Sequence, residues 1–140
     1  MRRPIDVLAS YLHLARAAKR RGQPLVRDRA LLLAGVIAAQ IDLLPIAAAC
    51  REQILTHNPR HLVNRWLTIG AALREEDFQS LVGQLSTRYG PERVEQLVHQ
   101  LGVPEAEERA DYASDGEYAA ALMDLDWDDL QRRFRSESEE

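Results

Sequence analysis

"ALLLAGVIAAQIDLLPIAAAC", residues 30–50, is the most apolar stretch of the chain and the one that decides its fold. It is roughly long enough to span a bilayer, but Gln40, Asp42 and Pro45 lie in its second half, where a charge is costly in lipid. Its first half is apolar nearly all round, which is typical of a central helix with neighbours on several sides. Pro45 suits the first turn of a new helix. We therefore interpret the stretch as two short buried helices that meet at Pro45.

The composition of the whole chain also favours helices in a soluble globular protein. Its 140 residues are enough for one domain with a core, and 46% of them are hydrophobic while 29% are charged. Only 6% are aromatic and β-branched residues do not cluster, which favours helix over strand. Cys50 is the only cysteine, so no intramolecular disulfide can form. Asp6, Ser10 and His13 interrupt the N-terminal apolar residues, so we expect a cytoplasmic protein rather than a signal peptide.

Apolar residues at helical spacing predict further helices on both sides of this stretch. We expect helices over residues 5–21, 25–42, 45–57, 75–88 and 91–101, and one that begins at Pro59. The predicted fold class is all-α. It is a single compact bundle of six or seven short helices, with an acidic C-terminal extension that carries an amphipathic helix.

Two of these helices are predicted to form a helical hairpin. Between them Gly90 provides a stop and Pro91 a start. Glu92 and Glu95 would repel phosphates, so we favour packing over a DNA-reading role for this pair. We expect both apolar faces to point inward; they consist of Phe78, Leu81, Val82 and Leu85 in one helix, and Val94, Leu97, Val98 and Leu101 in the other.

The charge of the chain changes sign towards its C-terminus. Residues 105–140 contain thirteen acids against four arginines, a net charge of −9, so the remainder must carry +5 to give the total of −4. We expect a helical core domain over 1–103, a linker over 104–114 and an acidic C-terminal extension over 115–140.

The acidic extension contains the amphipathic helix, predicted at about residues 121–134. Acids come early in it and arginines late, which suits the helix dipole. A helix of this kind docks in an apolar groove, which belongs either to this same protein or to a partner protein reached through the linker. The candidate partner-binding residues form one stripe, which consists of Met123, Trp127, Leu130 and Phe134.

The segment THNPRHLVNRW, residues 56–66, contains two histidines four residues apart. Asn58 is a favoured N-cap and proline is favoured next, so the histidines are predicted to lie on either side of a helix start. That register does not suit a metal-binding pair, and no metal site is predicted. Cations in a first turn favour the binding of an anion instead. That anion is either external or a carboxylate of the protein itself. The third alternative is a solvated helix cap with no anion. The candidate anion-binding residues are His57, Asn58, Arg60, His61 and Arg65.

The first thirty residues are basic, with a net charge of +6. Such a region can contact nucleic-acid phosphates, but aromatic residues for base stacking do not interleave with it beyond Tyr11. Solvated charge and an internal acidic partner are the alternatives. Because opposite charges attract at low salt, the acidic extension is a candidate internal competitor for this region. The candidate nucleic-acid-binding residues are Arg16, Lys19, Arg20, Arg21, Arg27 and Arg29.

No sequence motif specifies an enzyme. Cys50 and His57 could share a helix face as nucleophile and base, but the apolar surroundings of Cys50 favour simple packing. We predict no catalytic residue, no cofactor and no membrane partner. We expect a non-enzymatic intracellular adaptor or regulatory protein that contacts another protein through helix and groove. The alternative is a nucleic-acid or anion-binding regulator that uses the basic N-terminal region.

Overall fold

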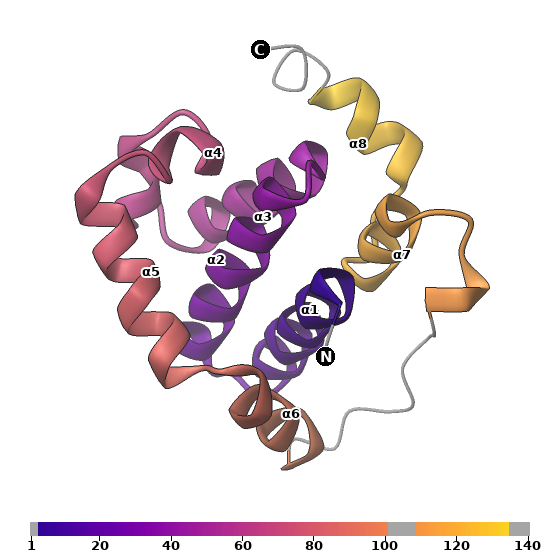
Figure 1. The fold of residues 1–140 in the computed structure, drawn as a ribbon, viewed down its shortest axis with the longest axis horizontal. Coiled ribbons are helices and arrows are strands. Elements are labelled where there is room, and N and C mark those ends of the chain that lie inside the picture. The colour runs from indigo at the N-terminus through magenta and orange to yellow at the C-terminus, as the bar shows by residue number, and fades with distance from the viewer. Residues whose placement is uncertain (1–2, 101–108, 135–140) are drawn as a thin grey trace.

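The computed structural model describes residues 3–100 and 109–134, and every regular element in these ranges is helical. The predicted all-α fold class is therefore confirmed. None of the described helices has the length and apolarity needed to cross a membrane. The described elements, drawn in Figure 1, are α1 (Pro4–Arg20), α2 (Pro24–Gln40), α3 (Leu44–His57), the 3₁₀ helix η1 (Leu62–Arg65), α4 (Ile69–Ala72), α5 (Glu76–Arg88), α6 (Pro91–Gln100), the 3₁₀ helix η2 (Arg109–Asp111), α7 (Asp115–Leu122) and α8 (Trp127–Arg133).

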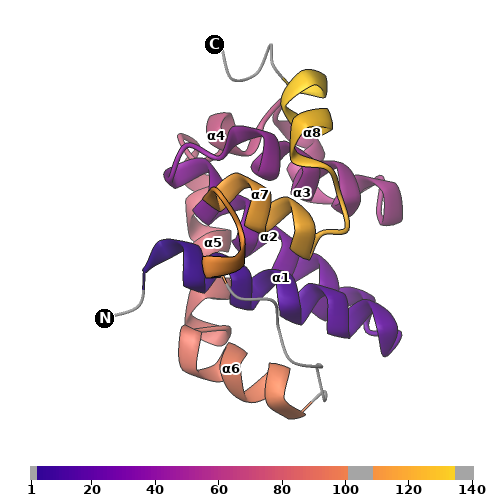
Figure 2. The same ribbon diagram turned by 90° about the vertical axis from the view of Figure 1, so that its right-hand side faces the viewer.

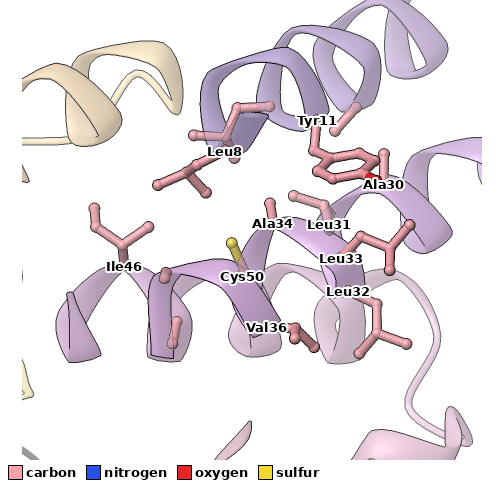
Figure 3. Packing of buried hydrophobic residues seen from close by; sticks show 14 of the residues in the cluster. Leu8, Tyr11, Ala30, Leu31, Leu32, Leu33, Ala34, Val36, Ile46 and Cys50 are labelled. Carbon is pink, nitrogen blue, oxygen red and sulfur yellow. The ribbon is translucent and has the colours of Figure 1, made fainter. Parts of the chain in front are cut away.

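Helix α2 is the centre of the bundle. It packs against α1 and α3 along its length and also contacts α4 and α5. All its residues from Ala30 to Val36 are buried, because its side chains are apolar on every face. Figure 3 shows Leu8 of α1, and Ile46 and Cys50 of α3, beside these residues. The two buried helices that the central apolar stretch predicts are thus α2 and α3.

The turns that join α1 to α2 and α2 to α3 have the same backbone form. Each contains a residue in the left-handed region, Gly22 with φ 66° in the first and Asp42 with φ 61° in the second. The next residue, Gln23 or Leu43, donates its backbone N–H to a carbonyl near the end of the preceding helix, at 2.9 and 2.8 Å. Such turns satisfy carbonyls that a helix end leaves free. They let three long helices pack side by side.

Gly35 lies at a close contact of α2 with α3 and α4. A Cβ atom added there would collide with Cδ1 of Ile69 and would lie 3.2 Å from Cβ of Cys50. Ile69 and Cys50 are both fully buried. Gly35 therefore allows close contact of α2 with α3 and α4.

Helices α5 and α6 have the predicted extents, but their apolar faces do not pack on each other. Phe78 and Leu85 of α5 are buried, and this helix contacts α2. Val94 of α6 is buried, and this helix packs against α1, below the rest of the bundle in Figures 1 and 2. The Tyr11 hydroxyl donates to the backbone carbonyl of Tyr89 at 2.6 Å, which holds the turn between them against α1. The predicted inward-facing hairpin is wrong, because α5 packs on α2 whereas α6 packs on α1.

The helix predicted to begin at Pro59 is also wrong. The chain makes a turn there, followed by η1, and the short α4 begins only after Thr68. Trp66 is extended, with φ −120° and ψ 146°, and Arg51 donates to its carbonyl at 3.1 Å. This break lets the Trp66 ring pack edge-on against Phe78, with ring centroids 5.3 Å apart. Thr68 caps α4, since its hydroxyl accepts the N–H of Ala71 at 3.0 Å.

The continuous C-terminal helix predicted over 121–134 is instead two helices, α7 and α8. Asp124, with φ 58°, lies in the turn that follows α7, and Asp126 caps α8 by accepting backbone N–H groups of its first turn. Helix α7 packs on α1 and α3, and α8 packs on α3 (Figure 2). Residues 115–134 are therefore part of the packed bundle.

The predicted boundary between the core domain and the extension falls outside the described residues. The structure does not describe residues 104–108 of the linker or 135–140 of the extension. Leu101 of the predicted apolar face also lies outside the described residues. The remainder of the linker begins with η2. The division into three segments stays a prediction.

We predict that Gly35→Ala destabilises the protein by about 1–3 kcal/mol, because the added methyl group overpacks the contact with Ile69 and Cys50. The matched control is Gly83→Ala in α5, where an added Cβ meets nothing within 4 Å. Removing that helical glycine should stabilise the protein by about 0.5–1 kcal/mol. Urea unfolding followed by circular dichroism measures both changes. Equal effects of the two substitutions would contradict the close contact.

Candidate binding groove between α2 and α5

A hollow lies where α2, α5 and the connection from α3 to η1 meet. Its volume is about 380 Å³. Its lining combines leucines with donor side chains, and consists of Leu25, Asp28, Arg29, Leu32, Asn58, His61, Leu81, Gln84, Leu85 and Arg88. We refer to it as the α2–α5 groove.

The apolar part of the α2–α5 groove runs from the core to the surface. Leu32 and Leu85 are buried, and Leu81 is half-buried between them and solvent. Leu25, at the start of α2, is 67% exposed, a high value for a large apolar side chain. Burial of such a side chain by a ligand is favourable because apolar surface leaves water. The groove therefore offers an apolar path that a ligand could cover.

The polar part of the groove is cationic. Arg29 is half-buried and donates to the Tyr89 hydroxyl at 3.3 Å, while Arg88 is exposed in the last turn of α5. The buried Asp28 carboxylate is paired with Arg27, with 3.1 Å between Nε and Oδ1. Among the described residues no carboxylate pairs with Arg29 or Arg88. The groove thus has positive charge that no acid of the described chain neutralises.

His61 adds a neutral donor to the groove. Its Nδ1 accepts the backbone N–H of Val63 at 3.0 Å, so in the neutral ring the proton is on Nε2. Burial lowers the pKa of the imidazole below its ordinary value of 6.5, an effect that the nearby Asp28 carboxylate opposes. At neutral pH the ring is therefore uncharged. Its Nδ1 caps η1, which fixes the ring in the groove wall.

The structure brings together only part of the predicted anion site. Asn58 follows the end of α3 and is not the cap of a new helix, so the first-turn N–H groups on which that prediction depended are not there. His57 is exposed and donates from Nδ1 to the Gln53 carbonyl at 2.7 Å. Arg65 lies over the Trp66 ring. Of the five candidates, Asn58 and His61 line the α2–α5 groove.

The stripe predicted for a partner is used within the bundle. Leu130 is buried, and Met123, Trp127 and Phe134 are half-buried against the core. The indole of Trp127 covers Gly116, where a Cβ would collide with the ring. The apolar groove that this stripe occupies thus belongs to the same protein, one of the two alternatives that the sequence leaves open.

The predicted basic region does not form one continuous patch of free cations. Arg16 is paired with Asp124, and Arg27 with Asp28, whereas Lys19 and Arg20 are exposed. Arg21 has interactions of its own, and Arg29 lines the α2–α5 groove. The cations are therefore divided between two sides of the bundle.

Cys50 and His57 do not form a nucleophile–base pair. The Cys50 thiol is fully buried, and burial raises its pKa to about 12. His57 is exposed at the end of the same helix. Among the described residues no group of three or more His, Cys, Asp or Glu side chains is arranged to hold a metal ion.

The α5 side of the groove was not singled out by the sequence. The sequence pattern places Leu81 and Leu85 in a hairpin interior and predicts no site role for Gln84 or Arg88. Their spacing of i, i+3, i+4 and i+7 places all four on one helix face. The sequence signal for this wall of the groove is an apolar helix face that continues into polar residues at the same spacing.

Comparisons with known proteins identify no relative, since no family model, no curated protein and no solved structure matches the chain.

We predict that the free energy of unfolding falls between pH 7.5 and pH 5.5, partly through His61. Its pKa is lowered in the folded state, so the unfolded chain binds the proton more readily as the pH falls through about 6.5, and stability present above that pH is lost. His61→Asn keeps an N-cap acceptor and removes the titration. Urea unfolding of both proteins at the two pH values measures the difference. A loss as large in His61→Asn as in the wild type would contradict the role of His61.

Proposed function

We propose that the protein is a non-enzymatic adaptor that accepts an acidic amphipathic helix of another protein in the α2–α5 groove. One observation carries the proposal: a leucine-lined hollow reaches the surface beside two arginines, Arg29 and Arg88, that no described carboxylate neutralises. Apolar side chains on one face of a helix suit the leucines, and acidic side chains beside them suit the arginines.

An amphipathic helix fits these features better than a small polar ligand does. Leu25 is 67% exposed at the start of α2, and Leu32 and Leu85 lie deeper along the same hollow. A ligand that spans this path must present apolar groups more than one residue apart, as the i and i+4 positions of a helix do. Location in the cytoplasm belongs to the same proposal; the unpaired, buried Cys50 is compatible with a reducing compartment.

Selection from a displayed peptide library against the wild-type protein tests the proposal. We expect enriched sequences with leucine-like residues at i and i+4 and with flanking acids. One enriched peptide is then synthesised, and its affinity for the wild type and for two groove variants is measured by fluorescence anisotropy. Leu25→Ser and Arg88→Glu should each weaken binding by about fivefold or more, because they remove an apolar contact and reverse a rim charge.

Each groove variant has a matched control elsewhere on the surface. Leu67 is 76% exposed and does not line the groove, so Leu67→Ser should leave the affinity unchanged. Arg93 is exposed on α6, so Arg93→Glu repeats the charge change away from the groove. Enrichment of basic peptides, or equal losses in the groove variants and their controls, would overturn the proposal.

A further inference from the structure

A second, smaller hollow lies on the other side of α2, where α1, α2 and α3 meet the turn between α7 and α8. Its volume is about 80 Å³, close to the size of one small polar group with its water. Its apolar residues form the floor, and its polar lining consists of Arg16, Lys19, Arg27, Gln53, His57 and Asp124. We refer to it as the basic hollow.

The basic hollow has more cations than acids. Arg16, Lys19 and Arg27 come from two neighbouring helices, α1 and α2. Arg27 is paired with Asp28, and Arg16 is paired with Asp124, which comes from the distant turn between α7 and α8. Lys19 is exposed at the rim and has no acidic partner among the residues described. Three cations thus face two carboxylates, and only Asp124 reaches in from the C-terminal part of the chain.

Asp124 is held in place by its backbone rather than by burial. Its φ of 58° is in the left-handed region, which favours glycine or asparagine after a helix. Leu125 donates its N–H to the Ala120 carbonyl at 2.9 Å, which closes the turn. The Asp124 side chain is nevertheless 76% exposed, so its ion pair with Arg16 is in contact with solvent. Exposed ion pairs contribute little to stability and are screened by salt.

We propose that the basic hollow binds a phosphate group and that Asp124 is its built-in competitor. This inference is independent of the α2–α5 groove, which lies on the other side of α2. Without Asp124, the three cations exceed the remaining acid, Asp28, by two charges. A phosphate monoester, with nearly two negative charges at neutral pH, would balance them, whereas the single carboxylate of Asp124 leaves one in excess. Arginine forks and a lysine are suited to phosphate oxygens.

Titration with inorganic phosphate, followed by amide NMR shifts against chloride at equal ionic strength, tests the inference. We expect Asp124→Asn to bind phosphate about fivefold more tightly than the wild type, with shifts centred on residues of α1 and α2 that line the hollow. Asparagine tolerates the left-handed backbone, so the turn should persist. Asp42→Asn is the matched control, because Asp42 has φ 61° after α2 and lies outside the basic hollow. It should bind phosphate as the wild type does.

A second variant keeps the test decisive if Asp124→Asn alters the fold. Lys19→Gln changes an exposed residue and should weaken phosphate binding by about fivefold, while Arg20→Gln, next to it and outside the hollow, should not. Unchanged affinity in both Asp124→Asn and Lys19→Gln would overturn the inference, as would absence of phosphate binding in all variants. A single-stranded oligonucleotide is titrated in parallel. Binding of the oligonucleotide without any response to phosphate would also overturn it, in favour of an extended polyanion surface.

Discussion

The burial of α2 on every side is the constraint on which the rest of the structure depends. A helix that is apolar all round cannot lie at the surface, so α1, α3, α4 and α5 must surround it. Gly35 allows α3 and α4 to approach within contact of its backbone, and left-handed residues after α1 and α2 let the long helices pack side by side. Helices α6, α7 and α8 then cover surface of α1 and α3 that these contacts leave exposed.

Both hollows arise where α2 leaves the core and becomes polar. Arg27 and Leu31, four residues apart, face the basic hollow, whereas Leu25, Arg29 and Leu32 face the α2–α5 groove. Asp28 stands between them: it lines the groove and pairs with Arg27. One buried carboxylate thus neutralises a cation of one site and borders the other. Helical spacing places these two sets of residues on different faces, so the first turns of α2 border two surfaces, both of them cationic.

Local sequence predicted the helices well because apolar spacing and the Gly-Pro signals are short-range properties. It could not predict which apolar faces meet, since α5 and α6 present similar faces yet pack on different helices. It failed at Asn58-Pro59 because the same dipeptide suits a helix start and a plain turn, and here the chain makes a turn. The sequence predicts a binding role for only three residues of the groove, Asn58, His61 and Arg29. It does not predict the α5 wall, because tertiary packing brings that helix to them.

Exchange of a ligand for Asp124 does not require α7 and α8 to leave the bundle. Those helices are held mainly by apolar burial, with Tyr118, Leu122 and Leu130 almost inaccessible to solvent. Burial of a side chain of this size contributes about 1.5–3 kcal/mol, whereas an exposed pair such as Arg16–Asp124 contributes about 1 kcal/mol or less. Displacing the Asp124 carboxylate from Arg16 therefore costs a bound phosphate little free energy. The Asp124 side chain can then rotate into solvent. The competition that we infer at the basic hollow is thus a local exchange of one carboxylate for one anion, and the C-terminal helices remain part of the core throughout.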